Sequence, residues 1–215
     1  MKDSLTILVG TCDAYSPIWN NFDILLKRYW DIECDIIVVS ETKSMPGDNY
    51  INVLPGAGLP WGYRMLCGID QIKTRYTCFI LDDYYMTSKI TNDFMQTHID
   101  LMQQYSADKI MFEIVTDWVE YKLDHIKDSL YKLKSDSLYL NSVQPSIWKT
   151  DFLKTVMKPE YSPWEFELKG NEFTSNLNPT ILLNAVPERI YFNFMRSGFK
   201  KEDGWEIIFK RENLV

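Results

Sequence analysis

Two adjacent carboxylates at the end of an apolar run are the residues best placed for chemistry. The run Tyr76–Leu81 is short, continuous and rich in strand-forming residues, which is typical of a strand buried on both faces of a parallel sheet. Asp82 and Asp83 follow it directly. Their charges repel each other, and a divalent cation with oxygen ligands would offset that repulsion. The alternative is a strand-end turn with two hydrated aspartates.

Polar residues also follow two other predicted strands. Thr11 and Asp13 come after the run Leu5–Gly10, and Glu41 comes after Ile36–Val39. Open α/β sheets bind ligands beyond the carboxyl ends of their strands. We therefore expect these side chains to meet the aspartate pair at one edge of a parallel sheet.

A second group of polar and aromatic residues lies later in the chain. Gln144 and Trp148 belong to the segment QPSIW, and Trp164, Glu165 and Glu167 belong to SPWEFE. A glutamate near a helix N-terminus can act as a general base if burial raises its pKa. The alternative is the ordinary amphipathic start of a helix.

Apolar periodicity predicts alternating strands and helices. Further strands are expected at Tyr50–Leu54, Ile110–Val115, Leu130–Lys134, Leu138–Leu140, Ile181–Leu183 and Ile190–Phe194. Helices are expected after the cap Ser16, at Trp61–Lys73, from the cap Thr91 to Gln104, at Trp148–Met157 and from Pro163. The polar and aromatic segment Asp117–Asp128 gives no prediction. The chain has no inter-domain linker, so one domain over residues 1–215 is expected.

Composition excludes several classes of protein. The net charge is −7 with no long basic run, which argues against a nucleic-acid partner. The four cysteines form no CxxC pair, and His98 and His125 are not spaced as zinc ligands beside them, which favours reduced thiols in a cytoplasmic protein. No apolar stretch has transmembrane length, so any membrane association would be peripheral, at the inner face. Glycine-rich dinucleotide and P-loop motifs are absent.

The order of these motifs resembles small bacterial glycosyltransferases of the GT-A fold from capsule and surface-polysaccharide gene clusters. The motifs are Thr-Cys-Asp, Ser-Glu-Thr, Trp-Gly-x-Arg, Leu-Asp-Asp-Tyr, Gln-Pro-Ser-Ile-Trp and Pro-Trp-Glu-Phe-Glu, and they cover most of the chain. The resemblance implies a three-layer α/β/α domain with a mostly parallel central sheet. The nucleotide-binding part would span about residues 1–115 and the acceptor part about 116–215.

The resemblance also implies a site. A nucleotide-sugar donor would contact Thr11, Asp13, Glu41, Trp61, Arg64, Asp82 and Asp83. Mg²⁺ or Mn²⁺ would bind Asp82 and Asp83, although Tyr84 stands where the usual Asp-x-Asp motif has its second aspartate. The acceptor or a phosphate would contact Gln144, Trp148, Trp164, Arg196 and Lys200. If the metal is absent, Arg196, Lys200 or Lys201 would stabilise the leaving diphosphate.

We therefore expect a hexosyl- or related glycosyltransferase acting on a surface-glycan or lipid-linked acceptor, with inversion favoured. Glu165 or Glu167 would be the base, and Glu165 is slightly preferred. One alternative is a sugar-phosphate nucleotidyltransferase, which normally has a glycine-rich basic loop after its first strand, whereas residues 11–16 contain neither glycine nor lysine. The other is a non-catalytic relative that binds a glycan or a partner.

Overall fold

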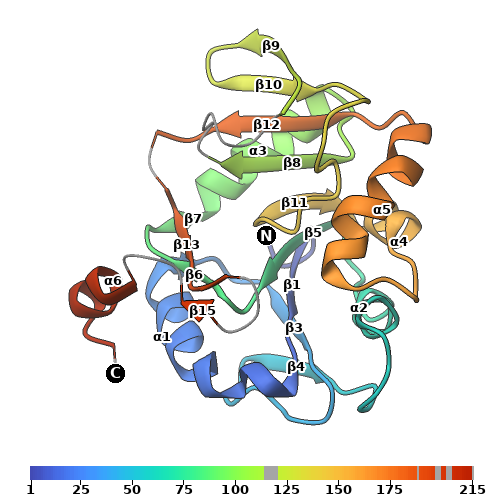
Figure 1. The fold of residues 1–215 in the computed structure, drawn as a ribbon. Coiled ribbons are helices and arrows are strands. Elements are labelled where there is room, and N and C mark those ends of the chain that lie inside the picture. Colours follow the sequence, from blue (N-terminus) through green and yellow to red (C-terminus); the bar gives the residue numbers. More distant parts are fainter. Residues whose placement is uncertain (114–120, 188, 197–199, 202–204, 215) are drawn as a thin grey trace.

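The computed structural model describes residues 1–113, 121–187, 189–196, 200–201 and 205–214. Its centre is a nine-stranded sheet (Figure 1). In spatial order the strands are β4 (Tyr50–Val53), β3 (Asp35–Val39), β1 (Leu5–Gly10), β5 (Tyr76–Leu81), β11 (Ser146–Lys149), β8 (Lys109–Glu113), β12 (Ile181–Ala185), β10 (Leu130–Leu133) and β9 (Leu123–Lys127). Only β11 and β10 run against the common direction of the other strands in this sheet, so the predicted mostly parallel sheet is confirmed.

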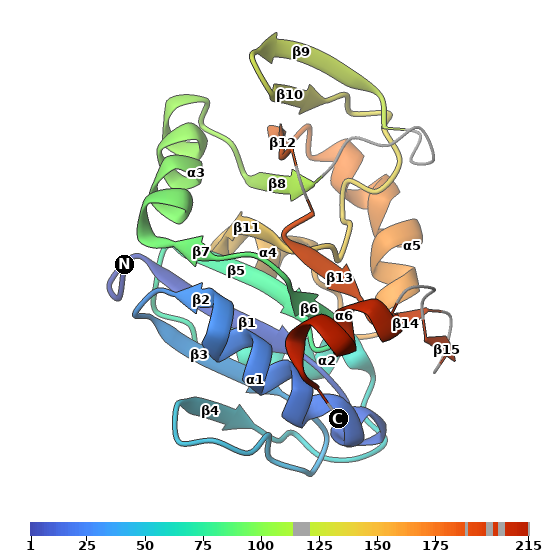
Figure 2. The same ribbon diagram turned by 90° about the vertical axis from the view of Figure 1, so that its left-hand side faces the viewer.

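Helices cover both faces of the sheet, as Figures 1 and 2 show. On one side lie α1 (Trp19–Tyr29), α3 (Asn92–Gln104) and α6 (Trp205–Glu212), and on the other lie α2 (Trp61–Ile69), α4 (Thr150–Val156) and α5 (Pro163–Asn176). Successive residues of β1 enter two different cores, because Ile7 packs with the first helix layer and Leu8 with the second. This alternation explains why β1 is apolar throughout: both of its faces are buried.

Three short strand pairs lie outside the central sheet. They are β6 (Tyr84–Met86) with β13 (Tyr191–Asn193), β2 (Trp30–Asp31) with β7 (Ile90–Thr91), and β14 (Met195–Arg196) with β15 (Lys200–Lys201). The first pair matters most, because β6 directly follows the aspartates and brings a late segment of the chain beside them.

Two glycines let α2 approach its neighbours closely. A Cβ on Gly68 would lie 2.2 Å from the Val39 side chain of β3, and one on Gly62 would lie 2.0 Å from the Lys158 carbonyl oxygen. Gly62 also donates its N–H to the Tyr161 carbonyl at 2.7 Å. The helix is therefore fixed both to the sheet and to the segment that leads into α5.

Most predicted elements are present, and four need correction. Ser16 does not cap a helix, because a 3₁₀ helix over Asp13–Ile18 precedes α1. The second predicted helix ends at Ile69 instead of Lys73. Leu138–Leu140 is a turn in which Tyr139 has a left-handed φ of 59°, which is incompatible with a strand.

The fourth correction concerns Trp148. This residue belongs to strand β11, inserted antiparallel between β5 and β8, and helix α4 begins only at Thr150. The segment Ser146–Trp148 is fully buried between these two strands. No alternation marks this segment as a strand in the sequence, because both of its faces are buried.

Candidate functional site

The three predicted strand ends meet at one edge of the sheet. Gly10 at the end of β1 is in register with Val39 of β3 on one side and with Leu81 of β5 on the other, and all three strands are parallel. Thr11, Ser40 and Asp82 therefore begin three adjacent loops. The expectation that Asp13, Glu41 and Asp82 share one edge is confirmed.

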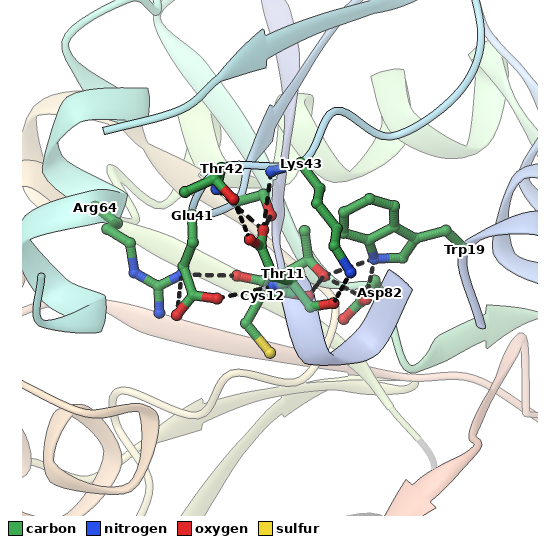
Figure 3. Close-up of polar contacts among 10 residues, drawn as sticks. Thr11, Cys12, Trp19, Glu41, Thr42, Lys43, Arg64 and Asp82 are labelled. Atoms are coloured by element: carbon green, nitrogen blue, oxygen red, sulfur yellow. Dashed lines mark hydrogen bonds and ion pairs between the residues drawn. The ribbon is translucent and has the colours of Figure 1, made fainter. Parts of the chain in front are cut away.

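Asp82 is anchored from inside the protein. Its side chain is buried, and its Oδ2 accepts hydrogen bonds from the Thr11 hydroxyl and, at 2.9 Å, from Trp19 Nε1 (Figure 3). The same indole N–H lies 2.8 Å from Thr11 Oγ1. Burial, and then the charge of Asp83, hold the pKa of Asp82 well above its usual range.

Asp13 organises the neighbouring loop. Its carboxylate accepts hydrogen bonds from the Ser40 hydroxyl, the Thr42 hydroxyl and N–H, and the Lys43 N–H. Burial would raise the pKa of Asp13, but these donors outweigh it and hold the pKa below its usual range. Because four donors already occupy its oxygens, Asp13 shapes the site instead of facing into it.

Glu41 links this loop to the helix that carries Arg64. One carboxylate oxygen accepts the Asp13 N–H at 2.9 Å, and the other lies 3.6 Å from Arg64 Nη1 (Figure 3). Arg64 Nη1 also lies 3.3 Å from the Thr11 carbonyl oxygen. These contacts fix a buried guanidinium beside the loop that follows β1.

A cleft of about 530 Å³ opens at this edge. Its lining comes from the ends of β1 and β5, from α2, from the start of α5 and from the loop before β11. Trp61 of α2 contacts Phe166 of α5 with ring centroids 5.8 Å apart, so these two helices pack against each other beside the cleft. The lining includes the predicted residues Thr11, Trp61, Arg64, Asp82, Asp83, Gln144, Trp164 and Glu167.

Three polar atoms in this lining are buried without a hydrogen-bond partner among the described residues: Arg64 Nε, Asp83 Oδ1 and Asn193 Oδ1. Asp83 is 9 % exposed, and burial raises its pKa to about 7. Buried polar groups are nearly always paired, so these atoms are positions where a ligand or ordered water can bind. A ligand that pairs with all three offers an acceptor to Arg64 and donors or positive charge to the two oxygens.

The two candidate bases differ in position. Glu165 forms a capping box with Ser162 and an ion pair with Lys169 at 2.6 Å. The Lys169 hydrogen bond, followed by those from Ser162, lowers its pKa to about 2, and its side chain is not part of the cleft lining. The capping pattern SPWE is visible in the sequence and points to this structural role.

Glu167 lies on the cleft wall. Its Oε1 accepts the Val143 N–H at 2.8 Å. Burial raises its pKa, although the Val143 hydrogen bond and the charge of Lys109 oppose that effect. A carboxylate with a raised pKa that faces the cleft is suited to take up a proton. Of the two candidate bases, Glu167 lines the cleft and Glu165 does not.

The predicted acceptor contacts divide in the same way. Gln144 lines the cleft and donates to the Tyr84 hydroxyl at 3.0 Å, and Trp164 lies at the cleft mouth with 62 % of its surface exposed. Trp148 is fully buried, with Lys109 Nζ 4.2 Å from its ring centroid, so it has no surface to offer an acceptor. Arg196 and Lys200 are opposite each other on β14 and β15, and their side chains lie outside the description.

Sequence reasoning missed several residues of the lining, among them Tyr15, Val143, Asn193 and Met195. Tyr15 belongs to the 3₁₀ helix that follows β1, close in sequence to Thr11 and Asp13, so its position was foreseeable. Burial, and then the charges of Asp83 and Asp82, raise its pKa to about 12. Asn193 reaches the cleft only because β13 pairs with β6, which no local pattern indicates.

A divalent cation fits the aspartate pair in its chemistry. Oxygen ligands suit Mg²⁺ and Mn²⁺. Asp83 Oδ1 is uncommitted, and a nearby positive charge would relieve the burial of both carboxylates. Within the described ranges, no third Asp, Glu, His or Cys joins the pair to complete a site.

The fold is that of the nucleotide-diphospho-sugar transferases. Among solved structures, TarS 1–349 from S. aureus in complex with UDP matches with a TM-score of 0.56 and 14% identity over 87% of this chain and 59% of that chain. The chain therefore spans about three fifths of the length of that 1–349 chain. A UDP-glucose pyrophosphorylase complexed with UDP-glucose matches with a TM-score of 0.53 and 12% identity, over 86% of this chain and 90% of that chain.

UTP-bound UGPase from Acinetobacter baumannii is a third match, with a TM-score of 0.55 and 10% identity over 90% of this chain and 88% of that chain. No protein-family model and no curated protein sequence matches this chain. The resemblance to capsule-cluster enzymes therefore stays a prediction. No helix in the part of the chain that the structure describes combines the length and the apolar character needed to span a bilayer.

Proposed function

We propose that this protein is a glycosyltransferase that takes its sugar from a nucleotide diphosphate. The observation that carries the proposal is the lining of one cleft. Arg64 of α2, Asp82 and Asp83 after β5, and Glu167 of α5 all belong to it. The fold supports it as well, since the matching structures hold UDP, UDP-glucose and UTP.

The proposed chemistry is an inverting transfer. The diphosphate lies against Arg64, whose unpaired Nε offers a hydrogen bond to an anionic oxygen. A divalent cation held by Asp82 and Asp83 would neutralise the negative charge that develops on the leaving diphosphate. Glu167 accepts the proton of the acceptor hydroxyl as that oxygen attacks the anomeric carbon from the opposite side. Trp164 offers an exposed apolar ring at the mouth for the acceptor sugar.

A sugar-phosphate nucleotidyltransferase is the competing function. The chain matches the fold of a UDP-glucose pyrophosphorylase over 90% of that chain, so the fold is compatible with that activity as well. That reaction builds charge on a triphosphate, and cations normally stabilise it. Arg64 is the sole Lys or Arg among the described residues that line the cleft, and the loop after β1 has no lysine or glycine. The site therefore favours transfer of the sugar over transfer of the nucleotide.

Donor hydrolysis tests the proposal without a known acceptor, because water can replace the acceptor hydroxyl. UDP-glucose and UDP-GlcNAc are incubated with the protein and released UDP is measured. We expect Glu167→Gln to bind UDP as the parent does but to release UDP at least ~10²-fold more slowly, the lower range for a general base. Glu165→Gln is the matched control on the same helix and keeps the parent rate.

Three results would contradict the proposal. Equal rates in both glutamate variants would remove Glu167 as the base. A product that keeps the donor's anomeric configuration would require a retaining mechanism. Pyrophosphate release from UTP and glucose 1-phosphate, without UDP release from either sugar nucleotide, would establish the nucleotidyltransferase instead.

A further inference from the structure

Position 84 is where the aspartate motif departs from the usual pattern, and the structure shows what stands beside it. Tyr84 is the first residue of β6, and its backbone is paired in antiparallel register with Asn193 of β13. The next residue of that segment, Phe194, donates its N–H to the Asp83 carbonyl at 2.7 Å. Strand β13 and the residue after it are therefore hydrogen-bonded to the segment that carries the aspartate pair.

Tyr84 cannot replace a carboxylate. Its ring packs edge-on against Tyr191 with centroids 5.4 Å apart, and its hydroxyl accepts a hydrogen bond from Gln144. Directly opposite neighbours on an antiparallel pair place their side chains on the same face. Asn193 and Tyr84 accordingly both line the cleft.

The two uncommitted oxygens of this region are one on Asp83 and one on Asn193. Asp83 Oδ1 and Asn193 Oδ1 are both buried and both residues line the cleft, and neither oxygen has a hydrogen-bond partner among the residues that the structure describes. Leaving a buried acceptor unpaired costs free energy, and here one acceptor lies in the turn before β6 and the other in β13, the strand paired with β6. Both are hard oxygen donors, which is the ligand type that Mg²⁺ and Mn²⁺ take.

We propose that Asn193 supplies the third protein oxygen of a divalent-cation site with Asp82 and Asp83. The cross-strand neighbour of position 84 thereby replaces the carboxylate that the sequence lacks there. The inference rests on the proposed function, because it takes the aspartate side of the cleft as the place where the donor diphosphate lies. It adds a residue about 110 positions away in the sequence to that site.

Mn²⁺ binding measured by electron paramagnetic resonance tests the inference without any sugar transfer. Free Mn²⁺ gives a signal that falls on binding, so a titration of the whole protein with MnCl₂ yields a Kd, alone and with UDP. We expect Asn193→Ala to raise the Kd for Mn²⁺ at least ~10-fold, the lower bound for residues that only support a ligand. Asn193→Asp keeps an oxygen at this position and binds at least as tightly as the parent.

The control variant is Asn92→Ala, which removes an exposed asparagine at the start of α3. It keeps the parent Kd. Circular dichroism and thermal unfolding show whether each variant is folded, and the two substitutions at position 193 act as checks on each other. Because Asn193 Oδ1 has no partner in the described part of the chain, neither substitution removes a hydrogen bond that the structure shows at that atom.

Defined outcomes overturn the inference. No Mn²⁺ binding by the folded parent, with or without UDP, would exclude the site. Folded Asn193→Ala with a Kd within about 2-fold of the parent would exclude the asparagine. If Asn193→Ala bound Mn²⁺ as the parent does but had lost affinity for UDP-glucose and not for UDP, the two oxygens would be assigned to sugar hydroxyls. UDP binding in the presence of EDTA is measured separately. This measurement tests the proposed nucleotide site independently of the proposed cation site.

Discussion

Asp83→Asn should change how stability depends on pH. Burial raises the pKa of Asp83 to about 7 in the folded protein, whereas an aspartate in the unfolded chain titrates near 3.9. The folded state therefore holds a proton that the unfolded state releases. The stabilisation of the folded state by protonated Asp83 is fully present below pH 3.9 and is lost as the pH rises towards 7. The neighbour Asp82 is affected in the same direction, because its pKa is raised partly by the charge of Asp83.

The size of the effect follows from the two pKa values. A difference of about 3 pKa units corresponds to about 4 kcal/mol over the whole range, and about half of it falls between pH 5.5 and 8. We expect the free energy of unfolding of the parent to fall by about 2 kcal/mol more than that of Asp83→Asn over this interval.

Urea unfolding followed by circular dichroism at several pH values measures the difference. Metal-free buffer is required, because a bound cation would favour the ionised carboxylate. Asp48→Asn is the control, because it makes the same substitution at an exposed loop position away from the cleft. Parallel curves for the parent and Asp83→Asn would refute the argument, because Asp83 would then titrate alike in the folded and unfolded states.

Three further substitutions test how the cleft is built. Gly62→Ala places a methyl group against the Lys158 carbonyl, so thermal unfolding should show a loss of about 1–3 kcal/mol; an unchanged Tm would mean that this segment yields freely. Thr11→Val keeps the shape but removes a buried donor to Asp82, and urea unfolding should show a loss of about 1–3 kcal/mol, absent if Trp19 alone satisfies the carboxylate. Ser162→Ala removes the α5 cap, and chemical unfolding should show a loss of about 1 kcal/mol; parent stability would contradict that capping role.

Local sequence pattern was sufficient to predict which residues of the site follow strands β1, β3 and β5. The runs that became β1, β3 and β5 are apolar because both faces of these strands are buried, and each ends at a polar residue. Parallel strands joined by right-handed crossovers must end at the same edge, so Asp13, Glu41 and Asp82 could be brought together from sequence. The α5 cap was equally local, since Ser162-Pro163 is a helix-start signal.

The roles of those residues depended on contacts that local pattern does not contain. The sequence predicted Asp13 and Glu165 as site residues. In the structure, Asp13 accepts hydrogen bonds from the loop after β3, and Glu165 accepts hydrogen bonds from the start of its own helix and from Lys169. Sequence shows that a carboxylate is present, and only the neighbouring donors decide whether it faces a ligand.

The sequence by itself determined the fold class, the sheet edge that carries the cleft and the two aspartates within it, because strand periodicity and handedness act over short stretches of chain. The tertiary structure decided that Trp148 is a core residue, that Glu167 faces the cleft and that Asn193 stands beside the aspartates. Each of these rests on pairing or packing between segments far apart in the chain. Such contacts are selected by the free energy of the whole packed structure and leave no periodic signal in any single segment.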